Sequence, residues 1–125
     1  TLAGIALASG GRAQVVGMSA LRGAMDLEDR VTRMLSGAIK PVSHWQICHD
    51  FHFGGFAKTN HRLTEFISKL HSGTGLLLDP VYTGKMLYGL CEWIRQGRIA
   101  SGARVLVVHT GGLQGWRGMG SARPA

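Results

Sequence analysis

Three short, mainly apolar runs constrain the fold of this chain more than any other feature. They occupy residues 15–18, 45–48 and 105–108, and segments with the apolar spacing of helices precede and separate them. Strands that are apolar on both faces are typical of a parallel sheet with helices on each side. The sequence therefore predicts an α/β fold, part of a three-layer arrangement around a mostly parallel sheet.

The first two predicted helices precede the second of these runs. One begins near Leu2 and ends at the glycine pair 10–11, because glycine readily ends a helix. Asp26 is a suitable N-cap for the other, and Pro41 is expected to terminate it. The apolar face predicted for this second helix consists of Leu27, Val31, Met34 and Leu35.

Two further helices are predicted between the second and third runs. Asn60 is a suitable N-cap for the first of them, and Gly97 stands where a C-terminal glycine is expected for the second. Residues 76–81 between them are predicted to be an apolar connector. The predicted apolar faces are Leu63, Phe66, Ile67 and Leu70 in the one helix and Leu87, Leu90, Cys91 and Ile94 in the other.

The charge pattern argues against a nucleic-acid partner. The formal net charge is +7, with 14 Lys and Arg against 7 Asp and Glu. The basic residues are scattered, however, and form no run of five or six along the chain. No apolar run approaches the roughly 18–20 residues of a membrane span. Two cysteines, Cys48 and Cys91, are too few for a disulfide framework, so we expect a cytoplasmic protein without a membrane partner.

From the start of the chain, we expect it to be part of a longer protein. At 125 residues it has the length of one domain or of a portion of one. It begins with Thr1 rather than Met and enters helical sequence at once. We expect residues 1–115 to form the structured portion and residues 116–125 to be an irregular tail.

Candidate functional residues lie where predicted strands and helices begin or end. Ligands of α/β sheets gather beyond the carboxyl ends of the strands, which singles out the loop after Val16 and the loops at residues 50–58 and 109–112. Thr1 opens a helix whose free N–H groups suit a phosphate, although a simple N-cap is the more ordinary role. His109 precedes two glycines that would allow a ligand close to the backbone, although a buried histidine bonded to a neighbouring loop is more common.

The segment 78–85 combines polar groups and a tyrosine immediately before the fourth predicted helix. Tyr82 and Thr83 are candidates for chemistry there. The alternative is that Asp79 or Thr83 caps the helix while Tyr82 packs against it. No metal site is predicted, because the nearby cysteine and histidines lack the spacing of a zinc motif. These residues are His44, Cys48, His49 and His52.

Two motifs together resemble a known enzyme family. They are Leu-Asp-Pro-Val-Tyr-Thr-Gly-Lys-Met at residues 78–86 and Val-Leu-Val-Val-His-Thr-Gly-Gly-Leu-Gln-Gly at residues 105–115. Both resemble the C-terminal half of the D-cysteine desulfhydrase / 1-aminocyclopropane-1-carboxylate deaminase family. The resemblance implies a tryptophan-synthase-β-like fold and pyridoxal 5′-phosphate as the cofactor. It extends from Thr1 to about Gly115.

The resemblance also implies roles for individual residues. Thr1 looks like the end of the family's glycine-rich phosphate loop and would bind the cofactor phosphate. Tyr82 would lie beside the cofactor ring and the substrate amine, as a catalytic residue that moves a proton or stabilises a carboxylate. Thr83 would face the pyridine nitrogen as a second cofactor-binding residue. Phe56, in the loop where many members carry a second active-site tyrosine, would contact the substrate together with Tyr82.

The residue at position 83 bears on the reaction that the resemblance implies. Family members that open the cyclopropane ring usually carry Glu where this chain has Thr83. A neutral hydroxyl does not enforce protonation of the ring nitrogen as a carboxylate does. The resemblance therefore favours β-elimination from D-cysteine to pyruvate, sulfide and ammonia, with deamination of 1-aminocyclopropane-1-carboxylate as the alternative.

The lysines of the chain depart from the family pattern. Family members hold the cofactor as a Schiff base on a lysine of the N-terminal half. The lysines here are not at matching positions; they are Lys40, Lys58, Lys69 and Lys85. We therefore expect the chain alone to be inactive, to need the missing N-terminal half, and to form a homodimer at full length. The alternative of another class is a non-catalytic remnant or binding module that keeps the fold.

Overall fold

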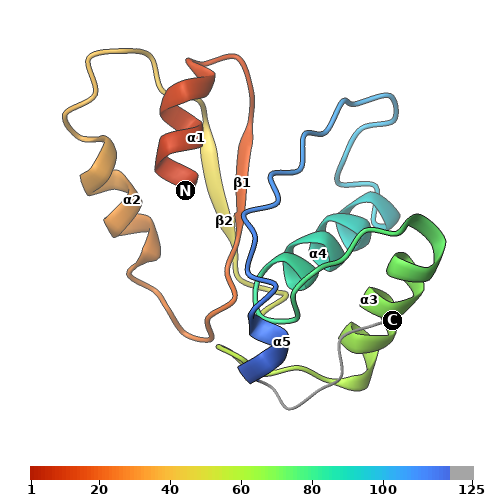
Figure 1. Ribbon diagram of the computed structural model, residues 1–125. Helices are drawn as coiled ribbons and strands as arrows, with labels where there is room; N and C mark the ends of the chain where they lie inside the picture. The colour runs from red at the N-terminus through yellow and green to blue at the C-terminus, as the bar shows by residue number, and fades with distance from the viewer. Residues whose placement is uncertain (119–125) are drawn as a thin grey trace.

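A computed structural model describes residues 1–118, which contain a two-stranded parallel sheet (Figure 1). Strand β1 (Val15–Met18) pairs with strand β2 (Trp45–Cys48). Val15 lies opposite Trp45 at one end, and Met18 lies opposite Cys48 at the other. Both strands have the bounds predicted from the sequence.

Helices cover both sides of this sheet (Figure 1). Helices α1 and α2 pack together on one side, whereas α4 packs against β1 on the other side and α3 packs on α4. This arrangement confirms the predicted α/β fold class. The helices are α1 (Leu2–Ser9), α2 (Leu27–Leu35), α3 (His61–Thr74), α4 (Thr83–Arg95) and α5 (Gly115–Gly118).

Most of the predicted helix ends are confirmed, each by a specific residue. Gly10 follows α1 with a left-handed φ of 57°, a conformation in which glycine carries no Cβ penalty. The Asn60 side chain accepts a hydrogen bond from the Leu63 N–H at 3.0 Å, which caps α3. Gly97, with φ 70°, follows α4. Helix α2, in contrast, already ends at Leu35, so the prediction that Pro41 terminates it was wrong.

The third predicted strand is not present. Residues 105–108 form no backbone hydrogen bond with another main-chain group among residues 1–118, and their side chains are 38% to 88% exposed. A strand needs a neighbour that satisfies its N–H and C=O groups. The prediction of a strand at residues 105–108 was therefore wrong, because the described part of the chain supplies no strand that pairs with them.

The predicted apolar face of α4 was wrong in part: Leu87 packs against the core, but the other end of the face does not. Cys91 and Ile94 are exposed, and the helix instead buries the face that carries Gly84, Tyr88 and Gly89. The two glycines allow this close approach, since a Cβ at Gly84 would lie 2.5 Å from Ile67 Cδ1 and one at Gly89 would meet the side chain of Phe51. Glycine contributes little to apolar periodicity, so the sequence pattern pointed to the opposite face. The predicted face of α2 fails in one place, because its residue Met34 is 72% exposed.

The core lies where α3 and α4 meet the connector and α5. Its buried side chains belong to Leu63, Ile67, Leu78, Tyr88 and Trp116. Trp116 belongs to α5 and donates from Nε1 to the carbonyl of Leu78 at 2.8 Å. Residues 116–118 are thus helical rather than irregular, while the remainder of the predicted tail lies outside the described residues. The division of the chain at residue 115 stays a prediction.

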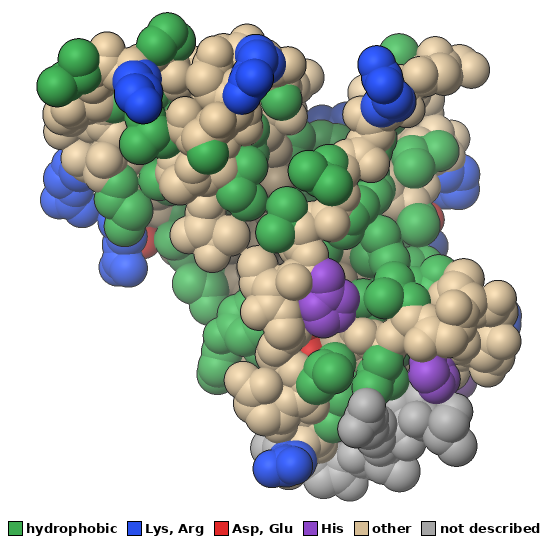
Figure 2. Space-filling model, turned by 45° about the horizontal axis from the view of Figure 1, so that its top comes forward, with side chains coloured by type: hydrophobic (Ala, Val, Ile, Leu, Met, Phe, Trp, Pro, Cys, Tyr) green, Lys and Arg blue, Asp and Glu red, His purple; other side chains and the backbone are tan. Residues whose placement is uncertain are grey.

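The surface shows no gathering of positive charge on the face drawn in Figure 2. The Lys and Arg side chains lie apart around the edge, and hydrophobic side chains occupy the area between them (Figure 2). Within residues 1–118, no helix has both the length and the apolar character needed to cross a membrane.

Candidate functional site

A buried carboxylate organises the turn that leads into α4. Asp79 is fully buried. Its side chain accepts hydrogen bonds from the backbone N–H groups of Val81, Tyr82 and Thr83 at 2.8, 2.7 and 2.8 Å. These N–H groups at the start of the helix have no intrahelical partner, and a negative charge is favourable there. Asp79 therefore stabilises the start of α4, as the capping alternative predicted.

Thr83 takes part in the same network through its hydroxyl. Its Oγ1 donates to Asp79 Oδ2 at 2.5 Å and accepts from the Asp79 N–H at 3.0 Å. Thr83 is 2% exposed. A hydroxyl has one proton and two lone pairs, so this one retains a single acceptor position and no donor. Its place at the pyridine nitrogen stays a prediction, and in this arrangement Thr83 can only accept a hydrogen bond from a protonated ring.

Tyr82, unlike the neighbouring Thr83, is accessible to solvent. Its side chain is 49% exposed, and its hydroxyl has no hydrogen-bond partner in the described part of the chain. Its backbone N–H, in contrast, is held by Asp79. The base of the Tyr82 side chain is thus fixed while the phenol is free to meet a ligand.

Phe56 lies beside Tyr82, although 26 positions separate them along the chain. The two ring centroids are 6.0 Å apart with an interplanar angle of 58°, and Phe56 is 59% exposed. This aromatic pair, Phe56 and Tyr82, brings together the two residues predicted to contact the substrate. Such a pair offers apolar contact area and one phenol to a small ligand.

The glycines of the second motif bring its backbone against the buried carboxylate. A Cβ at Gly112, whose φ is 87°, would lie 3.0 Å from Asp79 Oδ2, and one at Gly115 would lie 3.2 Å from Val81 Cγ2. Because Gly112 has no side chain, the backbone at this position can pack closely against Asp79. A Cβ at Gly111, in contrast, would meet no atom within 4 Å.

His109 joins this second motif to the connector. Its Nδ1 accepts a hydrogen bond from the Gly111 N–H at 3.1 Å, and its Nε2 lies 3.1 Å from the carbonyl of Leu77. Because Nδ1 is an acceptor, Nε2 carries the proton and donates it to that carbonyl. His109 is thus a histidine bonded to a neighbouring loop, as the more common alternative predicted, but it is exposed rather than buried.

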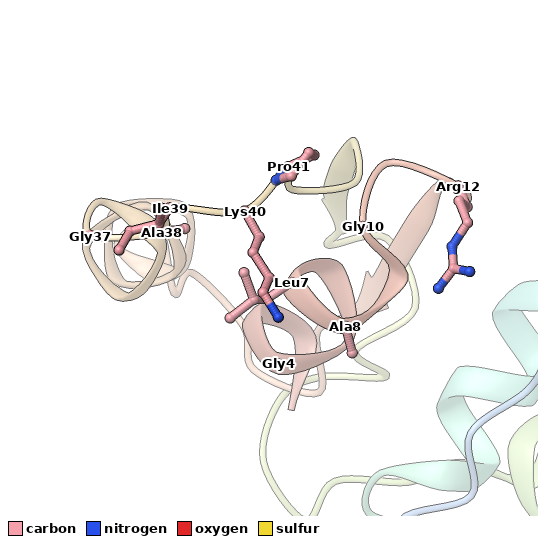
Figure 3. A pocket seen from close by; sticks show the side chains of 10 residues that line it. All are labelled: Gly4, Leu7, Ala8, Gly10, Arg12, Gly37, Ala38, Ile39, Lys40 and Pro41. Atoms are coloured by element: carbon pink, nitrogen blue, oxygen red, sulfur yellow. The ribbon is translucent and has the colours of Figure 1, made fainter.

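Thr1 lies apart from these contacts. It is exposed and occupies the N-cap position of α1, where its side chain makes no capping hydrogen bond. A groove lies along α1 from Gly4 to Ala8, between this helix and residues 37–41 (Figure 3). Its lining includes none of Thr1, Tyr82 and Thr83. The predicted role of Thr1 at the cofactor phosphate stays a prediction.

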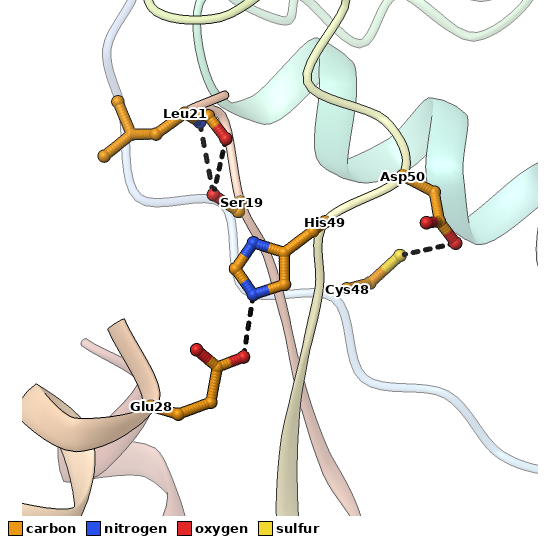
Figure 4. Close-up of polar contacts among 6 residues, drawn as sticks. All are labelled: Ser19, Leu21, Glu28, Cys48, His49 and Asp50. Atoms are coloured by element: carbon orange, nitrogen blue, oxygen red, sulfur yellow. Dashed lines mark hydrogen bonds and ion pairs between the residues drawn. The ribbon is translucent and has the colours of Figure 1, made fainter. Parts of the chain in front are cut away.

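Sequence reasoning missed a hydrogen bond between a histidine and a carboxylate at the carboxyl end of the sheet. His49, which follows β2, places Nε2 2.7 Å from Oε1 of Glu28 in the first turn of α2 (Figure 4). The hydrogen bond from His49 lowers the pKa of Glu28. Burial raises the pKa of the neighbouring Cys48 thiol, which donates to Asp50 at 3.7 Å. Over residues 1–118, no group of three or more His, Cys, Asp and Glu side chains is placed to hold a metal ion.

The lowered pKa of Glu28 predicts a pH-dependent contribution to stability. Above the ordinary value of 4.5, Glu28 is ionised in both states and the folded state keeps the contact with His49. As the pH falls, the unfolded chain binds its proton first, and the contribution is lost through the lowered pKa of the folded state. We expect the difference in free energy of unfolding between the parent and Glu28→Gln to shrink over this range, measured by urea denaturation at a series of pH values. Parallel curves for the parent and Glu28→Gln would contradict the expectation.

Comparisons with known proteins agree with the resemblance seen in the sequence. No family model matches the chain. The bifunctional D-cysteine desulfhydrase/1-aminocyclopropane-1-carboxylate deaminase, mitochondrial, of Arabidopsis thaliana is 38% identical over 90 residues, which are 70% of this chain and 22% of that protein. A D-cysteine desulfhydrase of Salmonella paratyphi C is 31% identical over 104 residues, which are 79% of this chain and 32% of that protein.

A solved structure decides the relationship. The crystal structure of an ACC deaminase homologue matches 93% of this chain with a TM-score of 0.78 and 28% identity. The chain is related to the D-cysteine desulfhydrase/1-aminocyclopropane-1-carboxylate deaminase family. It fits the C-terminal portion of that family's fold and covers 37% of the solved chain.

The described residues fit one side of a pyridoxal-phosphate site of this family. The free phenol of Tyr82 and the exposed ring of Phe56 suit contact with a planar ring and a small substrate. Thr83 fits only as an acceptor, because its proton is donated to Asp79. The lysine nearest to this site in sequence, Lys85, is 1% exposed and bonded to two backbone carbonyls, so it does not fit the role of a covalent anchor.

Proposed function

We propose that the longer protein containing this chain is a pyridoxal-phosphate-dependent enzyme that cleaves a small amino acid by elimination or deamination. The observation that carries the proposal is the exposed phenol of Tyr82 at the start of α4, beside Phe56 and without a hydrogen-bond partner among residues 1–118. Relatives that share this part of the sequence are named for D-cysteine desulfhydrase and 1-aminocyclopropane-1-carboxylate deaminase activity. The chain spans only 22% to 32% of their length.

The chemistry is shared between the cofactor and the residues of the chain. When bound, pyridoxal phosphate withdraws electrons from the amino acid and weakens the bonds at its α-carbon. Tyr82 is held at its backbone by Asp79 and presents its phenol, which can donate a proton to a leaving group or hold a substrate carboxylate. Phe56 lies beside Tyr82 and offers apolar contact area to a small substrate. Thr1 would contribute its hydroxyl and the N–H groups of α1 to a phosphate.

Between the two activities we favour β-elimination of D-cysteine to pyruvate, sulfide and ammonia. Position 83 carries a neutral hydroxyl, and its proton is already donated to Asp79. Thr83 therefore supplies no negative charge at a ring nitrogen, which is the feature that a carboxylate at this position would provide. Deamination of 1-aminocyclopropane-1-carboxylate is the second candidate, and the name of the Arabidopsis relative supports it.

The proposal requires a lysine from outside this chain. Of the lysines within it, Lys85 is buried and Lys69 pairs with Glu65 at 2.7 Å. We therefore propose that the 125 residues alone are inactive, and that the upstream part of the protein supplies the covalent anchor of the cofactor. The full-length protein is proposed to act in the cytoplasm as a homodimer.

Absorption spectroscopy and product analysis of the full-length protein test this function. We expect the purified protein to be yellow, with a visible band from bound cofactor that is lost after reduction with borohydride. D-cysteine should then yield sulfide and pyruvate faster than 1-aminocyclopropane-1-carboxylate yields ammonia. A colourless protein that does not take up added pyridoxal phosphate would overturn the proposal and favour a non-catalytic module. The reverse substrate preference would instead select the deaminase activity.

A further inference from the structure

Lys85 is buried to a degree that is rare for a charged side chain. It is 1% exposed, in the first turn of α4, and forms no ion pair with a carboxylate in the described part of the chain. Burial of an ammonium group is unfavourable unless hydrogen bonds replace its hydration. Burial accordingly lowers the pKa of Lys85, and the charge of Asp79 partly opposes that shift.

The hydrogen bonds of Lys85 go to one loop. Its Nζ donates to the carbonyl of His52 at 2.8 Å and to the carbonyl of Gly55 at 2.7 Å. Both carbonyls belong to the loop at residues 50–58, which lies more than 25 positions before Lys85 in the chain. A single side chain thus ties two carbonyls of this loop to the first turn of α4.

This loop has an unusual backbone that needs such support. Phe53 and Ala57 are the non-glycine residues with positive φ in the described part of the chain, each at 53°. Gly54 and Gly55 between them have φ of 98° and 121°. Left-handed conformations of residues with a Cβ are unfavourable and persist only where surrounding contacts hold them. The two carbonyl bonds from Lys85 are contacts of this kind.

The same tie connects the two residues of the aromatic pair. Phe56 directly follows Gly55, whose carbonyl Lys85 holds. Tyr82 precedes Lys85 by three positions, about one helical turn. The position of Phe56 opposite Tyr82, with ring centroids 6.0 Å apart, therefore depends on the link between these two segments.

We propose that Lys85 is a positioning residue, whose ammonium group holds the loop at residues 50–58 against α4 and thereby sets where Phe56 stands relative to Tyr82. The role of this placement in substrate binding rests on the proposed function. The link itself, which consists of the two hydrogen bonds from Lys85 to the loop, does not. Lys85 acts through the loop and touches neither substrate nor cofactor.

Amide hydrogen exchange of the cofactor-free, full-length protein tests the tie directly. Lys85→Met keeps the length of the side chain and removes its donors. We expect exchange in peptides covering residues 52–58 to become at least about tenfold faster, whereas peptides of α3 and of the two strands stay protected. Lys85→Arg, which retains the donors, should restore part of the protection. Lys69→Met is the matched control, because Lys69 is 77% exposed, and it should leave the loop unchanged.

Two outcomes of this experiment would overturn the proposal. In one, residues 52–58 stay as protected in Lys85→Met as in the parent. In the other, Lys85→Met and the neutral donor variant Lys85→Gln both lose protection throughout the sheet and α3. Lys85 would then support the fold as a whole and would have no specific effect on the loop.

Steady-state kinetics with D-cysteine test the consequence for the site. We expect Lys85→Met and Phe56→Ala each to lower kcat/KM about tenfold, and the double variant to be no worse than either one, because both act through the position of one ring. If the two losses in kcat/KM multiply in the double variant, the two residues act independently, and Lys85 does not act by setting the position of Phe56. If the parent itself is inactive, the proposed function fails, while the exchange experiment still decides whether Lys85 holds the loop.

Discussion

Tyr82→Phe is expected to lower kcat of the proposed full-length enzyme by about a hundredfold or more, which is the usual contribution of a positioned proton donor or acceptor. The substitution removes only the hydroxyl, which has no partner among residues 1–118. The backbone hydrogen bond to Asp79 and the contact with Phe56 both remain. Binding of the cofactor, measured by its visible absorption, should therefore change little while turnover of D-cysteine falls.

Tyr88→Phe provides a matched control for this experiment. Tyr88 is the second tyrosine of the chain and lies in the core against Phe53 and Phe66. Removal of its hydroxyl should leave kcat close to that of the parent. Equal losses in both variants, or full activity of Tyr82→Phe, would show that the phenol of Tyr82 does not take part in catalysis.

Asp79→Ala is expected to have the largest effect on stability, a loss of about 3–5 kcal/mol in the free energy of unfolding. The substitution removes the acceptor of three backbone N–H groups and of the Thr83 hydroxyl. These donors lie at the buried start of α4, where water cannot readily replace the carboxylate. The loss should appear as a lower midpoint in urea denaturation with an unchanged slope.

Two further variants define the cause of this loss. Asp29→Ala removes an exposed carboxylate from α2 and should change the free energy of unfolding by less than about 0.5 kcal/mol. Asp79→Asn preserves the shape of the side chain but places an amide donor against other donors, so it should also be strongly destabilising. An Asp79→Ala protein as stable as the Asp29→Ala protein would contradict the role assigned to this carboxylate.

Local features of the fold were largely predictable because they depend on neighbouring residues. Glycine after α1 and α4 and asparagine before α3 act within one helical turn, so their effects can be read from short segments. The two strands were predicted from apolar runs for the same reason. The third run failed, since pairing needs a partner strand, which no short segment can specify.

The sequence predicted which residues belong to the candidate site but not which contacts they make with one another. The resemblance singled out Phe56, Tyr82 and Thr83, yet only the folded chain shows that two of them are in contact and that the third is buried on Asp79. Lys85 was considered only as a possible anchor of the cofactor. Its bonds to the loop at residues 50–58 join segments about thirty positions apart, and no spacing rule relates them.

The sequence was enough to predict the α/β class, the helix ends at Gly10, Asn60 and Gly97, and the family to which the chain is related, because each follows from local chemistry or from a contiguous motif. The cap predicted at Asp26 was not confirmed, since its side chain makes no capping hydrogen bond. Only the tertiary structure decided which face α4 buries, which hydroxyl near the site is free and which lysine holds a loop. These properties depend on how closely two distant segments approach each other. The glycines at positions 84 and 89 set that distance for α4, and hydrogen bonds between buried groups then select the contacts that remain.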